Sequence, residues 1–271
     1  MAVGIRHVRF IMIRRGIFVV VAVLGCALSH AQIALSHNGS TVDIDEFSST
    51  IFSWIVGGTE QVFENSWYFR DGDAGTASLV STIDPNPTVT LFGTQGAEVV
   101  YQNSDLTVTI NYFLQANSNG TGADLAEQVV FETVFGIELR LFQYQDFDIA
   151  GTFTGDTATR QNSSTIMQFE GDFGVTTGAT PIPEFSEMSL WSDVLDDITG
   201  TAGYNLNTSA GNGIGETQSG DMTFAFQWNR NLGDRGSLVL STNKVAAVPE
   251  PATFAALALG AAALLRRRKK K

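Results

Sequence analysis

The stretch Leu106-Thr107-Val108-Thr109-Ile110-Asn111-Tyr112 alternates apolar and polar side chains along its whole length. A period of two places every apolar residue on one face of a β-strand, because successive side chains of a strand point to opposite sides. Met222-Thr223-Phe224-Ala225-Phe226-Gln227-Trp228 repeats the pattern with larger side chains. Both segments therefore predict strands that bury one face in a core.

Short strand-like runs continue through the middle of the chain, separated by clusters of Gly, Asn, Ser and Thr that are typical of turns. Many short strands with regular turn signals are the pattern of an all-β fold, and about a dozen strands suit one β-sandwich of jelly-roll type with two packed sheets. We place this sandwich at residues 32–244. The further predicted strands are Val42–Phe47, Ile51–Val56, Val62–Phe69, Thr88–Phe92, Glu98–Gln102, Ala126–Phe135, Glu138–Gln145, Thr165–Glu170 and Ser237–Ser241.

One segment of the body favours a helix. Pro183 suits a first helical position, and the apolar residues from Phe185 to Ile198 recur near helical spacing. We therefore expect a short helix over Pro183–Ile198. The following residues, Gly200–Gly220, are rich in Gly, Thr, Asn and Ser and predict a long loop or a weak hairpin.

The charges of the 271-residue chain are unevenly placed. The net charge is −12, but ten of the 16 Lys and Arg residues lie in the first 15 or the last six positions. The segment 32–248 holds six Lys and Arg against 27 Asp and Glu, a formal charge of −21. A body this acidic is not expected to bind nucleic acid, because phosphate contacts need clustered Lys and Arg.

The N-terminus has the three parts of a secretory signal. Arginines between Arg6 and Arg15 precede a short apolar run, and small residues at Ser29 and Ala31 occupy the positions that signal peptidase requires. We expect residues 1–31 to be removed, so that Gln32 begins the mature chain. The alternatives are an uncleaved anchor helix, for which the run is short, and lipidation at Cys26. Cys26 is the only cysteine, so cleavage excludes disulfides and cysteine-bound zinc.

The C-terminus also has three parts in strict order. Val248, Pro249, Glu250 and Pro251 come first, and the 14 apolar residues of Ala252–Leu265 follow. Lys and Arg stay on the cytoplasmic side of a membrane, so the basic end predicts an inward tail and an outward body. Fourteen residues of helix span only about 21 Å of a core of about 30 Å, which suggests a temporary stop. The chain ends in Arg266, Arg267, Arg268, Lys269, Lys270 and Lys271.

This ordered tail resembles the PEP-CTERM sorting signal of Gram-negative bacteria, which is also catalogued as an ice-binding protein C-terminal domain. The resemblance covers Val248 to Lys271 only and by itself implies nothing about ice. It implies recognition by an exosortase, cleavage at Pro249-Glu250-Pro251 and transfer of the body to a surface acceptor. We accordingly assign 245–248 as a linker and 249–271 as the sorting signal. The two flanking prolines favour an extended segment, which is what a protease cleft binds. An ordinary stop-transfer helix is the alternative.

Catalytic side chains are scarce in the body. His37 is its only histidine and lies six residues from the predicted mature N-terminus, where a mobile, solvated side chain is expected. A Ser-His-Asp triad would depend on that residue, a Cys-His pair has no cysteine, and Lys244 is the only lysine of the body. Carboxylate pairs suited to glycoside hydrolysis could come from Asp146, Asp148, Glu170 or Asp172, although 27 acids make close pairs expected by composition alone.

Calcium is the better-motivated cofactor, because it binds clustered carboxylates on flexible turns. Asp71 and Asp73 flank a glycine in a tight acidic turn and are our candidate ligands, although the turn departs from the EF-hand pattern and could be structural. Other acidic clusters are Gln145–Asp148 and Asp193–Asp197. Apart from such a structural calcium ion, no cofactor is expected. The tryptophans could stack on sugars but are expected in the core; they are Trp54, Trp67, Trp191 and Trp228.

Together these features predict a non-enzymatic structural or adhesive protein. Its expected course is export, a membrane-anchored precursor, and a final place at the cell surface, the outer membrane or the extracellular matrix. Its expected partners are signal peptidase, exosortase, the membrane and exopolysaccharide. The alternative is a carbohydrate-binding or carboxylate-based polysaccharide-modifying protein of the exopolysaccharide matrix, in keeping with the acids and aromatics of a β-sandwich.

Overall fold

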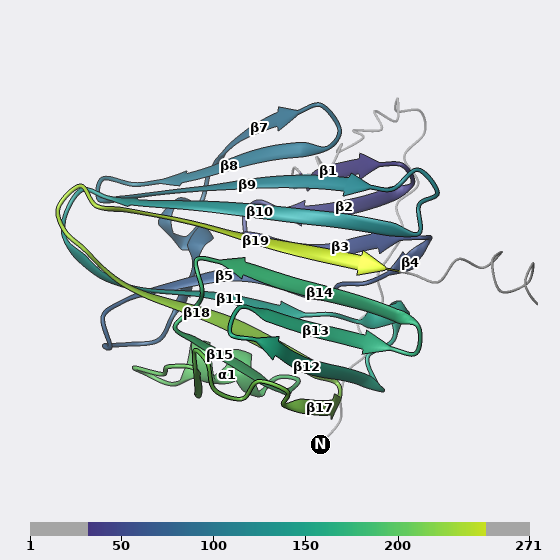
Figure 1. Ribbon diagram of the computed structural model, residues 1–271. Coiled ribbons are helices and arrows are strands. Elements are labelled where there is room, and N and C mark those ends of the chain that lie inside the picture. The colour runs from purple at the N-terminus through teal and green to yellow at the C-terminus, as the bar shows by residue number, and fades with distance from the viewer. Residues whose placement is uncertain (1–31, 248–271) are drawn as a thin grey trace, which may run out of the picture. The chain divides into compact units, whose positions relative to one another are not determined.

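The computed structural model describes residues 32–247, whose strands form two antiparallel sheets packed face to face (Figure 1). The predicted all-β sandwich is confirmed. Its sheets hold ten and nine strands, more than the eight strands that a whole jelly roll divides between two sheets. The predicted signal peptide, including Ser29, Cys26 and Ala31, lies outside the described residues, and so does the tail from Val248 onward.

Sheet A is the ten-stranded sheet and follows the order β1-β2-β3-β5-β11-β18-β15-β16, with β4 and β6 pairing at its side. Its strands are β1 (Gln32–His37), β2 (Ser40–Asp45), β3 (Thr50–Val56), β4 (Thr59–Glu60), β5 (Glu64–Asp71), β6 (Ser78–Leu79), β11 (Ile137–Asp146), β15 (Phe185–Leu190), β16 (Thr208–Ser209) and β18 (Met222–Leu232).

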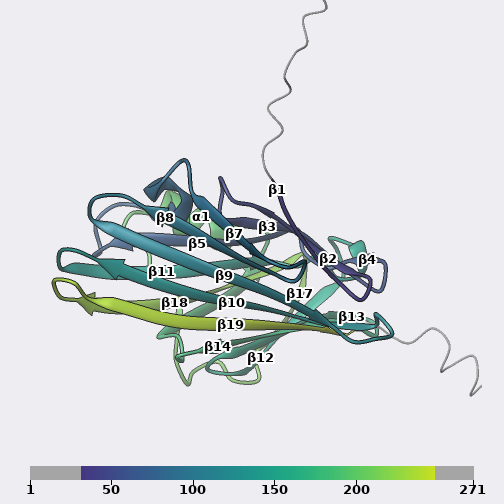
Figure 2. The same ribbon diagram turned by 90° about the horizontal axis from the view of Figure 1, so that it is seen from above.

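Sheet B is the nine-stranded sheet and follows the order β17-β12-β13-β14-β19-β10-β9-β8-β7. Seen from above, β8, β9, β10 and β19 run side by side (Figure 2). The strands are β7 (Thr88–Phe92), β8 (Gly96–Gln102), β9 (Leu106–Ala116), β10 (Gly122–Thr133), β12 (Asp156–Asn162), β13 (Thr165–Glu170), β14 (Phe173–Thr180), β17 (Thr217–Gly220) and β19 (Ser237–Ala247).

Two of the corners at which the chain crosses between the sheets are neighbours. One joins β10 to β11 and the other joins β18 to β19, and the backbone N–H of Thr133 in the first donates to the carbonyl of Gly236 in the second at 3.0 Å. A side chain at Gly236 would lie 2.7 Å from the carbonyl oxygen of Gly233, so the close corner requires glycine there. These corners connect the paired strands β10 and β19 of sheet B to the paired strands β11 and β18 of sheet A.

The main core lies between the sheets and is built from the alternating positions that the sequence indicates. Val108, Ile110 and Tyr112 of β9 are all buried, as the pattern predicts. The rings of Trp67 and Trp228 stack with centroids 5.9 Å apart, and Trp54 is buried as well. Three of the four tryptophans are therefore in the core as expected, whereas Trp191 is 53% exposed.

The predicted helix over Pro183–Ile198 is wrong in its first half. Phe185–Leu190 forms β15, which pairs with β18 and buries Ser186 and Met188 on alternate positions. Sheet pairing outweighs local helical spacing there, because the edge of β18 offers a full ladder of backbone hydrogen bonds. The helix α1 runs over Asp193–Gly200 instead. The short 3₁₀ segments are η1 (Val80–Ile83) and η2 (Ile149–Gly151).

Helix α1 covers the outer face of sheet A. Its Val194 and Ile198 belong to a second apolar cluster, which includes Tyr68, Phe142 and Tyr144 from that face. The central strands of sheet A are consequently buried on both sides, which explains the nearly continuous burial along β18. Among residues 32–247, no helix is long and apolar enough to cross a membrane.

The body extends further toward the sorting motif than predicted. Val245–Ala247, assigned from the sequence to a linker, form the end of β19 and pair with both β10 and β14. The missed signal is the alternation Leu238, Leu240, Thr242, Lys244, Ala246, in which a lysine takes an inward position. Only Val248 separates the last paired residue from Pro249.

Candidate functional site

Four strands of sheet A end or begin at one edge and bring acidic side chains together there. Asp146 is the last residue of β11 and pairs with Glu64, the first residue of β5, and with Thr223 near the start of β18. Asp221 immediately precedes β18, and its carbonyl accepts the backbone N–H of Trp191 at 2.7 Å. The antiparallel register thus assembles residues that are far apart in the sequence.

A cleft of about 260 Å³ opens at this edge. Three carboxylates and three aromatic side chains line it: Phe63, Asp146, Asp148, Phe153, Trp191 and Asp221. The aromatic rings are unusually open to solvent, with exposed fractions of 53% for Phe63, 67% for Phe153 and 53% for Trp191. Exposed apolar surface concentrated in one place is typical of a binding site.

The three carboxylates form a compact cluster. One oxygen from each of Asp146, Asp148 and Asp221 lies within 4.8 Å of the others. Asp146 is only 2% exposed, and its Oδ1 has no hydrogen-bond partner. Its Oδ2 accepts a long hydrogen bond of 3.4 Å from the hydroxyl of Tyr144.

Burial raises the pKa values of all three acids, and repulsion by neighbouring carboxylates adds to the rise for Asp146 and Asp148. Burial raises the pKa of Asp146 to about 8, and the charges of Asp148 and Asp221 contribute to that rise. The pKa of Asp148 is raised by burial and by the charge of Asp221, and the pKa of Asp221 is raised by burial. The cluster therefore favours a proton or a cation over three free carboxylates.

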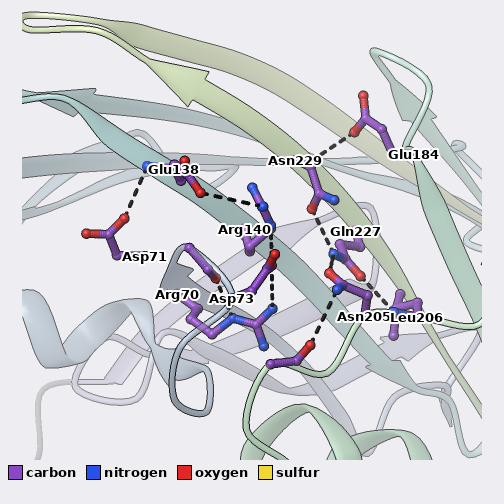
Figure 3. A network of polar contacts seen from close by, with 12 residues as sticks. Arg70, Asp71, Asp73, Glu138, Arg140, Glu184, Asn205, Leu206, Gln227 and Asn229 are labelled. Atoms are coloured by element: carbon purple, nitrogen blue, oxygen red, sulfur yellow. Dashed lines mark hydrogen bonds and ion pairs between the residues drawn. The ribbon is translucent and has the colours of Figure 1, made fainter.

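The candidate calcium ligands from the sequence lie elsewhere, near the opposite end of β11 (Figure 3). The Oδ1 of Asp71 accepts the backbone N–H of Glu138 at 3.1 Å. The carboxylate of Asp73 lies 3.0 Å from Nε of Arg140 and 3.7 Å from Nη2 of Arg70. The hydrogen bond and charge of Arg140 lower the pKa of Asp73. Two guanidinium groups already balance this carboxylate, so the structure favours the turn-forming interpretation of this pair.

Of the candidate carboxylates from the sequence, the structure brings together Asp146 and Asp148 but not Glu170 and Asp172, which do not line the cleft. Asp193 and Asp196 lie in the first turn of α1, where acids stabilise a helix. His37 is not a mobile terminal residue, because it lies in β1 and its Nδ1 accepts the backbone N–H of Ala116 at 2.8 Å. Asp221, Phe63 and Phe153 were not predicted, since only the strand pairing places them beside Asp146.

The comparisons with known proteins address the tail and the fold separately. Residues 247–269 match the family of the PEP-CTERM protein-sorting motif. The chain carries a PEP-CTERM sorting motif. Such a motif implies an exported, membrane-associated precursor and processing by an exosortase. No curated protein matches the chain in sequence.

Solved structures share the fold of the body at very low sequence identity. A bacterial glucoamylase complexed with acarbose superposes with a TM-score of 0.58 and 11% identity, over 86% of this chain and 34% of the glucoamylase. A candidate aldose 1-epimerase from Escherichia coli K12 gives 0.55 and 7%, over 81% and 99% of the two chains. A galactose mutarotase-like protein from Lactobacillus casei gives 0.53 and 10%, over 80% and 100%. This chain spans about a third of the glucoamylase, and at such identities the likeness establishes the fold alone.

Proposed function

We propose that this PEP-CTERM protein is cut by an exosortase at Pro249-Glu250-Pro251 and displayed at the cell surface or in the extracellular matrix. Its body then acts as a non-enzymatic adhesive module that binds carbohydrate of the matrix. The sorting motif supports the first part. The cleft at the edge of sheet A supports the second.

The observation that carries carbohydrate binding is the combination of exposed rings and carboxylates in one cleft. Ring faces can stack on the C–H faces of a sugar, while carboxylate oxygens accept hydrogen bonds from its hydroxyl groups. The formal charge of −21 on residues 32–248 disfavours anionic polymers and points to a neutral or cationic glycan. The names of the similar structures, a glucoamylase and mutarotase-like proteins, agree with a carbohydrate ligand.

Removal of two exposed rings of the cleft is expected to weaken glycan binding. The double variant Phe153→Ala/Trp191→Ala should weaken binding to the producer's own exopolysaccharide at least about tenfold, which corresponds to 1.4 kcal/mol. Isothermal titration of the full chain with that polysaccharide, after a glycan array has chosen the fragment, measures the loss. The matched control is Phe135→Ala. Phe135 is similarly exposed, at 62%, but it lies just before the first residue of β11, at the end of that strand opposite to Asp146.

The same samples distinguish adhesion from polysaccharide modification, the alternative that the clustered acids suggest. Binding without release of reducing ends supports the adhesive function. If the wild type releases reducing ends and Asp148→Asn does not, the protein is a carboxylate-based hydrolase and the adhesive function is wrong. If wild-type protein neither binds nor cleaves the polysaccharide, carbohydrate recognition is wrong.

Substitution of the sorting motif is expected to block C-terminal processing. In the producing cell, wild-type protein should end within the Pro249-Glu250-Pro251 motif, whereas Pro249→Ala/Pro251→Ala should retain Lys271. The prolines are expected to favour an extended segment, and alanines would allow the helix predicted for residues 252–265 to extend into it. Intact-mass spectrometry of the membrane and surface fractions reads both C-termini.

The exchange Ala246→Ser, three residues before Pro249, is a useful comparison because it leaves both prolines in place. It should be processed like the wild type. A wild-type surface protein that still ends at Lys271 would overturn the proposed cleavage.

A further inference from the structure

We propose that the carboxylates of Asp146, Asp148 and Asp221 bind a Ca²⁺ ion at the edge of sheet A. The three side chains come from the end of β11, the turn that follows it and the residue before β18. Their oxygens lie within 4.8 Å of one another, close enough to share one ion. This inference goes beyond carbohydrate binding and stands without it.

The strongest support is a buried oxygen that lacks any donor. Asp146 is 98% buried and lines the cleft, yet its Oδ1 has no hydrogen-bond partner. A buried carboxylate oxygen without a partner is expensive, and native proteins satisfy such groups with a donor, a water or an ion. This observation concerns one atom and is independent of how many acids are nearby.

The charges around the cluster also favour a cation. Of the ion pairs formed within residues 32–247, none includes Asp146, Asp148 or Asp221. The further acids Glu60 and Glu64 lie near enough to act on the cluster electrostatically. Three carboxylates without an ion-pair partner therefore lie close together, two further acids add to their repulsion, and a divalent ion would relieve it.

The donor set selects the kind of ion. Three carboxylates supply three to six hard oxygen ligands, and no histidine or cysteine is among the residues that line the cleft. Zinc prefers nitrogen and sulfur ligands, whereas Ca²⁺ takes six to eight oxygens in a flexible geometry. The open cleft leaves the remaining positions to water or to hydroxyl groups of a ligand.

Terbium, a luminescent substitute for Ca²⁺, provides a direct test on the full chain in detergent, since Trp191 lines the same cleft and can sensitise it. We expect Tb³⁺ luminescence on tryptophan excitation that Ca²⁺ displaces. We also expect Ca²⁺ at about 100 times its dissociation constant to raise the melting temperature by about 5–10 °C relative to EDTA. Trp191→Phe should lose most of the luminescence but keep the Ca²⁺-dependent shift.

Two variants should need at least ten times more Ca²⁺ than the wild type to give either signal. They are Asp146→Asn/Asp148→Asn and Asp148→Asn/Asp221→Asn. The second leaves the buried Asp146 in place, in case its exchange disturbs folding. The charge-matched control, Asp124→Asn/Glu132→Gln, changes two exposed acids of β10 and should behave as the wild type. Coinciding melting curves of the wild type in Ca²⁺ and in EDTA would overturn the proposal. So would a Ca²⁺-dependent rise in melting temperature that is as large in both site variants as in the wild type. Wild-type protein that binds Ca²⁺ but no glycan would overturn only the proposed carbohydrate binding.

Discussion

Lys244→Met is expected to reduce the free energy of unfolding by about 3–5 kcal/mol, the usual result of removing one partner from a buried ion pair. Lys244 of β19 is 1% exposed, and its Nζ bonds the Oε1 of Glu127 in β10, which is also 1% exposed. Burial lowers the pKa of Lys244, and the Glu127 carboxylate opposes that change. Methionine would fill the space but leave Glu127 without its counter-charge.

The pair belongs to a hydrogen-bond network that joins the two sheets. Glu127 of sheet B accepts hydrogen bonds from the indole of Trp67 at 2.6 Å and from the amide of Asn65 at 2.9 Å, both in sheet A. Gln143 of sheet A donates to Asn65 at 3.1 Å and to Thr242 of sheet B at 3.1 Å. The Glu127 carboxylate accepts hydrogen bonds from donors in both sheets. Removal of its counter-charge should therefore weaken the contacts of both sheets.

Urea unfolding of Lys244→Met measures this effect, and its matched control is Asn243→Met. Asn243 is the preceding residue of β19 but is exposed on the opposite face, so its exchange should change stability by no more than about 0.5 kcal/mol. The double variant Glu127→Gln/Lys244→Met removes both charges and should lose less than Lys244→Met alone. Equal stability of Lys244→Met and wild type would show that the pair contributes nothing.

Alternation along single strands was enough to predict an all-β fold of two packed sheets, but not the number of strands in them. Leu106–Tyr112 lies within β9 and Thr165–Glu170 coincides with β13. In a half-buried strand the buried and exposed faces appear in the sequence as alternating apolar and polar residues. Asp156–Asn162 was missed, since its inward positions carry Asp156, Ala158 and Arg160 rather than large apolar residues. The same obstacle ended the last predicted strand at Ser241, because Lys244 puts a charge at an inward position, and the residues from Val245 onward were assigned to a linker.

The candidate site was predictable only in part. Asp146 and Asp148 are neighbours in the sequence, and their acidic cluster is visible there. Asp221 and Trp191 join them through the pairing of β18 with β11 and β15, which no local pattern specifies. The glycine-containing turn favours Asp71 and Asp73 as ligands in the sequence, but only the fold shows that Arg140 reaches Asp73 from the neighbouring strand. A site that strand register assembles can be predicted only when the register is known. A sorting signal is a linear motif and can be recognised from the sequence alone.

A second large effect is expected from Asp156→Asn, which should flatten the dependence of stability on pH. Asp156 is 1% exposed at the start of β12, and burial raises its pKa to about 7, with smaller contributions from Glu170 and Asp148. Its Oδ2 accepts the side-chain amide of Gln168 at 2.7 Å, while Oδ1 has no partner. Asparagine keeps an acceptor for Gln168 and carries no charge.

The direction follows from proton binding. Between about pH 4, the ordinary pKa of an aspartate, and about pH 7, the folded protein holds the proton of Asp156 and the unfolded chain has lost it. Stability therefore falls by up to about 1.4 kcal/mol per pH unit as pH rises through this window, and the slope from this group vanishes outside it. Other buried acids add slopes of the same sign, so the informative quantity is the difference between variant and wild type.

Urea unfolding in EDTA at pH 4, 5, 6, 7 and 8 supplies that difference. Relative to wild type, Asp156→Asn should gain stability steadily from pH 4 to pH 7 and then remain level, with a total change of up to about 4 kcal/mol. The exposed Asp124→Asn removes a charge of the same sign without touching a buried site, and its curve should follow the wild type. A constant offset between Asp156→Asn and wild type across the whole range would mean that Asp156 is ionised in the folded protein throughout. A gain confined to pH 4–7 would instead show that this body accepts a buried, protonated carboxyl group between its sheets, because the fold brings Asp156 inward whatever its charge.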